Sequence, residues 1–156
     1  MKKLLLFLIL VSNFAMAQMP DISNVWLNNS KPYIGTIGND KQELKLKINI
    51  SEQNKKNDQE YFVSGYSLVD KNYAKLEGKL TITKYWDAKK KGVVFGDYEF
   101  AEENKGKHSG LFKGKFVYRF RWNKTTEKVE GQVIELTGDW KSYDGTLNFK
   151  TSLTNQ

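Results

Sequence analysis

Residues 112–122, FKGKFVYRFRW, carry the strongest secondary-structure signal in the chain. The even positions are aromatic apart from one glycine, and the odd positions are lysine or arginine apart from Val117. An alternation of period two is typical of a β-strand that buries one face and exposes the other. The stretch therefore predicts a long strand whose aromatic face packs into a core.

The preceding stretch, residues 94–100, pairs with this strand in one antiparallel register. Residues directly opposite each other in such a pair point to the same side of the sheet. Once Phe100 is placed opposite Phe112, apolar residues meet on one face and opposite charges meet on the other. The resulting pairs are Tyr98 with Gly114, Gly96 with Phe116, Val94 with Tyr118, Glu99 with Lys113, and Asp97 with Lys115.

Three earlier segments show the same alternation and predict three more strands. One loop is predicted at 51–60, between the first and second of these strands, and another at 85–92, after the third. The hairpin between the second and third is expected to place Leu68 opposite Leu76, and Tyr66 opposite Gly78. The predicted inner faces are Leu44, Leu46, Ile48 and Ile50; Phe62, Ser64, Tyr66 and Leu68; and Leu76, Gly78, Leu80 and Ile82.

Two hairpins are expected downstream, with turns at Thr125-Thr126 and at Asp144-Gly145, the latter a strong two-residue turn signal. After the Thr125-Thr126 turn, the residues predicted to point inward have odd numbers. Before the Asp144-Gly145 turn, they have even numbers. This change of parity requires an extra residue, so a β-bulge is predicted near Ile134-Glu135. The predicted pairs are Trp122 with Val129, Arg121 with Glu130, Phe120 with Gly131, Tyr118 with Val133, Ser142 with Leu147, Trp140 with Phe149, and Leu136 with Leu153.

Together these patterns predict an all-β domain of about eight strands, an antiparallel up-and-down meander closing into a barrel. A strongly curved open sheet or a β-sandwich is the alternative. Residues 32–38 are expected to add a short strand, and Trp26 to plug or cover one end. The pattern resembles lipocalin- and avidin-type barrels, with Asn24-Val25-Trp26 where lipocalins carry Gly-x-Trp. The glycine is missing, so the resemblance implies general ligand binding and assigns no residue a role.

The first residues, 1–17, have the pattern of a cleaved secretory signal peptide. Lys2 and Lys3 precede the apolar run Leu4 to Val11, and Ala15-Met16-Ala17 forms a small-x-small cleavage site. The apolar run is shorter than the roughly 18 residues of a spanning helix. We therefore expect one domain, residues 18–156, exported to the periplasm or the medium with no membrane span. The chain has no cysteine, so it is disulfide-free.

Residues that could carry chemistry are sparse, and the sequence predicts no catalytic residue, metal site or cofactor. The single histidine, His108, lies in a polar turn, and carboxylate pairs such as Asp97 and Glu99 have lysine partners across the strands. The net charge of +7 is mild and scattered. Nucleic acid is not expected as a partner, because the aromatic side chains of 112–122 lie on the opposite face from its cations.

The best candidate binding site is the inner aromatic set, with Glu135 re-aimed inward by the predicted bulge. The candidate ligand-binding residues are Tyr66, Tyr98, Phe116, Tyr118, Trp122, Glu135 and Trp140. A barrel of this size is filled by its own side chains or holds one small ligand. We expect a non-enzymatic binding protein that takes a small hydrophobic or aromatic molecule inside, or a protein partner at the rim. A periplasmic inhibitor or immunity-type protein and a carboxylate-dependent hydrolase are the alternatives.

Overall fold

The computed structural model describes residues 19–88 and 91–156, so the expected signal segment 1–17 lies outside the described residues. A short helix and a 3-10 turn precede eight β-strands. The elements are α2 (Ser23–Trp26), η1 (Asn28–Ser30), β1 (Tyr33–Ile37), β2 (Gln42–Asn54), β3 (Asn57–Val69), β4 (Asn72–Ala88), β5 (Lys91–Glu102), β6 (Gly110–Asn123), β7 (Lys128–Ser142) and β8 (Asn148–Thr154).

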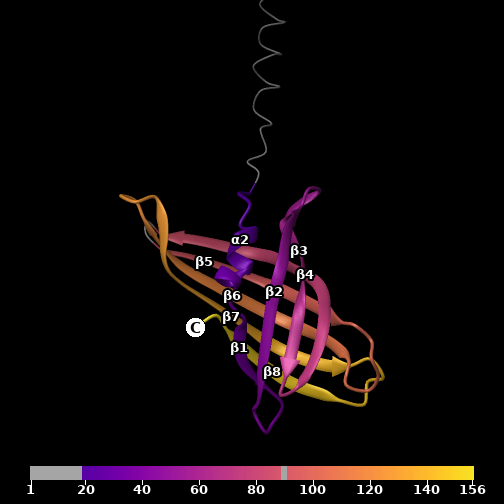
Figure 1. The fold of residues 1–156 in the computed structure, drawn as a ribbon. Helices are drawn as coiled ribbons and strands as arrows, with labels where there is room; N and C mark the ends of the chain where they lie inside the picture. The colour runs from indigo at the N-terminus through magenta and orange to yellow at the C-terminus, as the bar shows by residue number, and fades with distance from the viewer. Residues whose placement is uncertain (1–18, 89–90) are drawn as a thin grey trace, which may run out of the picture.

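The strands form one ring-like sheet in which each strand is antiparallel to its neighbour in sequence (Figure 1). β1 pairs with both β2 and β8, which joins the two ends of the meander. The expected all-β, up-and-down architecture is confirmed. The short strand expected within residues 32–38 is also present, as β1.

The β5–β6 hairpin has the register that the sequence predicts, pair for pair. Phe100 lies opposite Phe112, and both are buried. On the outer face, the Lys113 ammonium lies 3.0 Å from Glu99, and that of Lys115 lies 3.1 Å from Asp97. Gly96 makes room for an aromatic ring as expected, because a Cβ there would lie 2.4 Å from the ring of Phe116.

The predicted register of β3 is wrong. The β3–β4 turn consists of two residues, so Val69 lies opposite Asn72 and Gly65 opposite Leu76. Asp70 enters this turn with φ of 51°, a left-handed conformation that Asp tolerates better than most residues. The inward residues of β3 are therefore Tyr61, Val63 and Ser67, whereas Phe62 and Tyr66 lie on the outer face.

Two predicted loops are largely strand. β2 and β3 continue to a tip at 55–56, and β4 and β5 extend into the stretch 85–92. A register shift in β2 between Ile48 and Ile50 leaves Ile48 buried and turns Ile50 outward, against the prediction. The inner face of β4 is as predicted, with Leu76, Leu80 and Ile82 buried.

The bulge in β7 exists, but it lies at Gly131 and not at Ile134-Glu135. Gly131 has φ of 64°, and the register shifts opposite Phe120 and Arg121. Glycine takes this conformation without strain, so it is the natural place for the extra residue. Trp122 with Val129 and Arg121 with Glu130 are paired as predicted, whereas Phe120 meets Gln132 and Tyr118 meets Ile134.

The β7–β8 hairpin confirms the predicted pairs Trp140 with Phe149 and Leu136 with Leu153. Its turn is wider than the two residues predicted, since β7 ends at Ser142 and β8 begins at Asn148. The backbone N–H of Ser142 still donates to the carbonyl of Leu147, at 3.0 Å. The predicted position of the turn at Asp144-Gly145 is therefore confirmed, whereas its predicted length of two residues is wrong.

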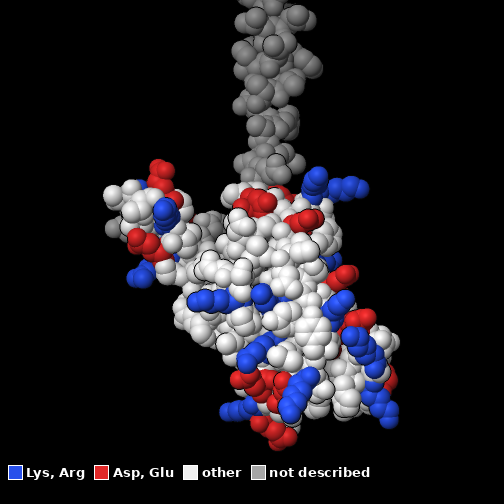
Figure 2. Space-filling model, viewed as in Figure 1, with Lys and Arg blue, Asp and Glu red and all other residues white. Residues whose placement is uncertain are grey.

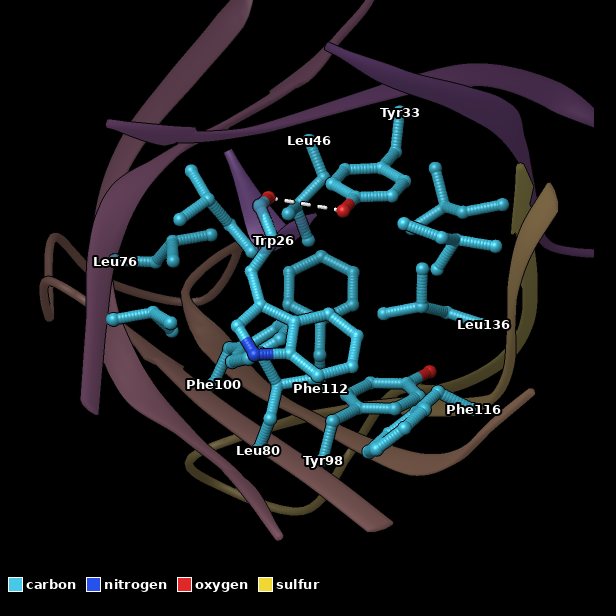
Figure 3. Close-up of a cluster of buried hydrophobic side chains, with 14 of the residues drawn as sticks. Trp26, Tyr33, Leu46, Leu76, Leu80, Tyr98, Phe100, Phe112, Phe116 and Leu136 are labelled. Carbon is cyan, nitrogen blue, oxygen red and sulfur yellow. Dashed lines mark hydrogen bonds between the residues drawn. The ribbon is translucent and has the colours of Figure 1, made fainter. Parts of the chain in front are cut away.

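Trp26 fills the ring near one of its ends, as the sequence predicts. α2 places the indole among inward side chains of several strands, including those of Phe100, Tyr98 and Leu80 (Figure 3). The hydroxyl of Tyr33 donates to the carbonyl oxygen of Trp26 at 2.9 Å, which fixes the helix to β1. Trp26 is 1% exposed. A helix of four residues thus contributes one of the largest side chains of the core.

Candidate binding surface at the rim of the ring

The two ends of the ring differ. We call the end with the β2–β3, β4–β5 and β6–β7 hairpins the rim, and the opposite end the base. α2 lies at the rim, between the β2–β3 hairpin and the β4–β5 and β6–β7 hairpins (Figure 1). In Figure 1 the β6–β7 hairpin is the one that reaches furthest from the ring. The rim is therefore the end at which strands extend beyond the ring.

The base is closed by a buried carboxylate. Glu102 Oε2 accepts hydrogen bonds from the backbone N–H of Gly110 at 3.0 Å and from the indole N–H of Trp140 at 2.9 Å. Its Oε1 accepts one from the hydroxyl of Ser67, and the hydroxyl of Tyr143 donates to its backbone carbonyl. None of the ion pairs found in residues 19–88 and 91–156 includes Glu102. The carboxylate is thus held by neutral donors and ties β3, β5, β6 and β7 together.

Four of the predicted ligand-binding residues belong to the packed interior. Tyr98, Phe116, Tyr118 and Trp140 are all buried. The Trp26 ring lies edge-on to Phe116 and Tyr118, with centroid distances of 5.0 and 6.0 Å. Burial raises the pKa of Tyr118 to about 12. All four belong to the same buried cluster as Trp26, so side chains of the chain itself occupy the space where a ligand was expected.

The other three lie elsewhere. Tyr66 is on the outer face, where its ring packs against Tyr73 at 5.1 Å. Glu135 points outward and pairs with Arg119, because the bulge lies four residues before it. The expectation of an inward carboxylate at Glu135 is therefore wrong. Trp122 is on the inner side of β6 but beyond the core, and it is 41% exposed.

A four-stranded extension carries Trp122 past the ring. The pairing of β3 with β4 ends at Glu60 and Thr81, and the pairing of β8 with β7 ends at Thr154 and Glu135. Beyond these points β4, β5, β6 and β7 pair only with one another. We call this part the extension; it comprises residues 83–88, 91–95, 117–123 and 128–133.

The inner face of the extension is aromatic and partly exposed. Tyr85 lies opposite the buried Val94 and is 51% exposed. Phe120 lies over Gly92, where a Cβ would come within 2.2 Å of its ring. Trp122 and Val129 face each other near the tip. Burial raises the pKa of Tyr85, and the charge of Asp87 raises it further. We call Tyr85, Phe120, Trp122 and Val129 the rim patch.

Figure 2 shows charges of both signs around the end of the extension, which stands apart from the body of the molecule. Two surface depressions of about 470 Å³ each lie on the outside of the ring, not in its centre. One is lined mainly by the charged ladder of β4, β5 and β6, and the other lies over Ile50 and Phe62. Neither overlaps the rim patch.

The described residues contain no candidate cluster of metal-ligating side chains and no candidate membrane-spanning helix. Within residues 19–88 and 91–156, no group of three His, Cys, Asp or Glu side chains could hold a metal ion, and His108 is exposed in its turn. No helix in the same ranges has the length and hydropathy of a membrane-spanning segment.

Sequence reasoning missed Tyr85 and Glu102. Tyr85 was placed in a loop, because the alternation of β4 breaks where its register with β5 shifts between Ile82 and Lys84. Glu102 has the same parity as the inward residues Tyr98 and Phe100, which was the available signal.

Comparison of the chain with family models, with curated proteins and with solved structures gives no match.

Proposed function

We propose that this protein is an exported, non-enzymatic binding protein that holds a protein partner at the rim patch. One observation carries the proposal: the ring interior is occupied by Trp26, whereas Tyr85, Trp122 and Val129 are exposed together on the extension. Clustered exposed apolar side chains on a soluble protein are typical of an interaction surface. Tyrosine and tryptophan are also the residues that most often dominate the energy of protein interfaces.

The proposal of export to the periplasm or the medium is supported by the signal pattern of residues 1–17. The ring suggests a lipocalin- or avidin-like barrel, a fold class that commonly serves binding. An inhibitor or immunity-type protein for a secreted toxin or hydrolase fits this proposal, since such a protein needs a rigid body and one recognition surface. A carboxylate-dependent hydrolase is not retained, because Glu135 points outward.

A small aromatic molecule in the interior is the second candidate. Within the described residues, the indole N–H of Trp26 and the hydroxyl of Tyr98 are buried without a hydrogen-bond partner. Buried polar groups are usually paired, so a small molecule that accepts a hydrogen bond from either group is the ligand that this interior would suit. The close packing around Trp26 makes the rim patch the stronger candidate.

Affinity capture from the native host tests the proposal. The exported protein is used as bait beside the variants Trp122→Ala and Tyr85→Ala, with Phe62→Ala as a matched control on an exposed aromatic outside the rim. Each rim variant is expected to lose about tenfold or more of a specific protein partner, the size of effect seen at interface hot spots. Equal recovery by all four baits would overturn the rim assignment.

A further inference from the structure

We infer that the free edge of β4, residues 83–88, takes up an extended acidic peptide of the partner as an additional strand. This inference rests on the proposed function and specifies how the partner is held. Strand addition to an exposed sheet edge is a recurring mode of peptide recognition, in which backbone hydrogen bonds supply affinity and alternate side chains supply specificity.

The edge is unpaired on the side that faces β3. The last residue of β4 with a partner in β3 is Thr81, whereas β4 continues to Ala88. From Lys84 to Ala88 it pairs with β5 alone. Thr83–Ala88 are all exposed, and among the described residues no turn or loop backbone bonds to them. Every second N–H and C=O of this stretch is therefore available to another chain.

The corresponding edge of β7 is partly covered. The backbone N–H of Asn155 donates to the carbonyl of Ile134 at 3.2 Å, and the side-chain amide of Gln156 donates to the carbonyl of Gln132 at 3.3 Å. The tail after β8 thus occupies acceptors on β7. No comparable segment covers β4 within the described residues, so the extension has one capped edge and one open edge.

Side chains along the open edge define the pattern of the incoming strand. Lys84 lies opposite Phe95 and points to the outer face together with Trp86, which is 52% exposed. Tyr85 points to the inner face and belongs to the rim patch. A paired strand would therefore set its outer residues beside Lys84 and Trp86, and its inner residues beside Tyr85. Acidic outer residues and apolar inner residues match these neighbours.

Charge favours an acidic strand over a second copy of this chain. Lys84 and Lys91 are exposed and take part in none of the ion pairs found in residues 19–88 and 91–156. Arg121 lies opposite Lys91 in the next strand of the same outer face. An edge lysine also opposes pairing of like strands, a common device against self-association. An acidic strand avoids this repulsion, because its carboxylates can form ion pairs with these lysines.

The test uses synthetic hexapeptides and the full chain exported by its host. One peptide alternates glutamate and valine, and the second alternates lysine and valine. The third is the glutamate peptide with proline in place of valine; it cannot pair as a strand, because proline has no backbone N–H. Binding is measured by calorimetry. Amide hydrogen exchange of residues 83–88 is measured by NMR. We expect the glutamate–valine peptide alone to bind, and to slow exchange at alternate residues of this stretch.

A charge reversal provides the matched variant. Because Lys84 is exposed, Lys84→Glu should fold normally, and it should weaken the glutamate–valine peptide about tenfold while strengthening the lysine–valine peptide. Lys107→Glu, on an exposed turn at the base, should change neither affinity.

Three results would overturn strand addition: no binding of the glutamate–valine peptide, protection located outside 83–88, or protection of 83–88 that rises with protein concentration without peptide. The last result would indicate a second copy. A host partner that is lost with Trp122→Ala but retained with Lys84→Glu would keep the proposed function and reject this mode of binding.

Discussion

At the scale of single residues, Trp26 joins the N-terminal helix to the ring. The indole of Trp26 packs against the aromatic rings of Tyr61, Phe116 and Tyr118 at centroid distances of 5.8, 5.0 and 6.0 Å. Replacing a buried aromatic side chain of this size by alanine removes its contacts and leaves a cavity. Trp26→Ala is expected to lower the free energy of unfolding by about 3–5 kcal/mol in urea titrations.

Trp86→Ala is the control for Trp26→Ala, because Trp86 is exposed on the outer face of the extension. It should change the free energy of unfolding by no more than about 0.5 kcal/mol, the usual range for surface substitutions. Equal effects of the two substitutions would mean that Trp26 is not part of the core.

Glu102 shows how a buried carboxylate is stabilised without a cation. In Glu102→Gln, the amide oxygen can keep the bonds from Gly110 and Trp140 while the amide N–H₂ donates to Ser67. Glu102→Ala leaves all three donors without their acceptor, which costs about 1–3 kcal/mol for each buried group left unpaired. Urea titrations should therefore show a much larger loss for Ala than for Gln. A loss as large in Gln would show that the charge itself is required.

The buried tyrosines set the alkaline limit of stability. Burial raises the pKa of Tyr118 to about 12 and also raises the pKa values of Tyr61 and Tyr98, all from the ordinary value of 10.0. A raised folded-state pKa contributes stability that is complete below pH 10 and is lost as the pH rises toward 12. Tyrosinate absorbance should rise together with unfolding in this window. Ionisation of Tyr61, Tyr98 and Tyr118 themselves near pH 10 without unfolding would contradict their burial.

At the scale of elements, one glycine aligns β7 with both of its neighbours. Gly131 has φ of 64°. An alanine there is strained by about 1–2 kcal/mol in the left-handed region. Gly131→Ala should lower the midpoint of urea unfolding accordingly, and Gly131→Asn should lower it less, because Asn tolerates this conformation. If Ala and Gly are equally stable, the bulge lies elsewhere, as at the predicted Ile134-Glu135.

The sequence predicts elements well where two signals agree. In the β5–β6 hairpin, apolar matching on one face and charge matching on the other permit one register, and that register is present. In β3, apolar residues occur at both parities, with Tyr61 and Val63 on one face and Phe62 and Tyr66 on the other. Alternation alone cannot choose between two such faces, and the short turn at Asp70-Lys71 made the choice.

The proposed binding surface was less predictable than the fold, because it depends on where strand pairing stops. The inward direction of Tyr98, Phe116, Tyr118 and Trp140 follows from alternation, but their burial depends on Trp26 and on closure of the ring. The exposure of Trp122 follows from where the β7–β8 pairing stops. β8 pairs with β7 only from Glu135 onward, six residues beyond Val129, which lies opposite Trp122. Strand lengths are decided by partners far along the chain, and local patterns do not encode them.

At the scale of the whole molecule, the two ends of the ring are stabilised differently. The Glu102 network ties the strands at the base, and Trp26 fills the ring near the rim. The extension rises from that rim with an aromatic inner face and a free edge at β4. The interior therefore supplies stability, and the extension carries the proposed recognition surface.

The most direct measurement is native mass spectrometry of the protein recovered from its host, with wild-type and Trp122→Ala chains compared. The account predicts a protein partner at a fixed ratio to the wild-type chain, a strong loss of that partner in Trp122→Ala, and no small molecule retained by either. A small molecule bound at one copy per chain, and equally to both chains, would contradict the account and place the binding site inside the ring.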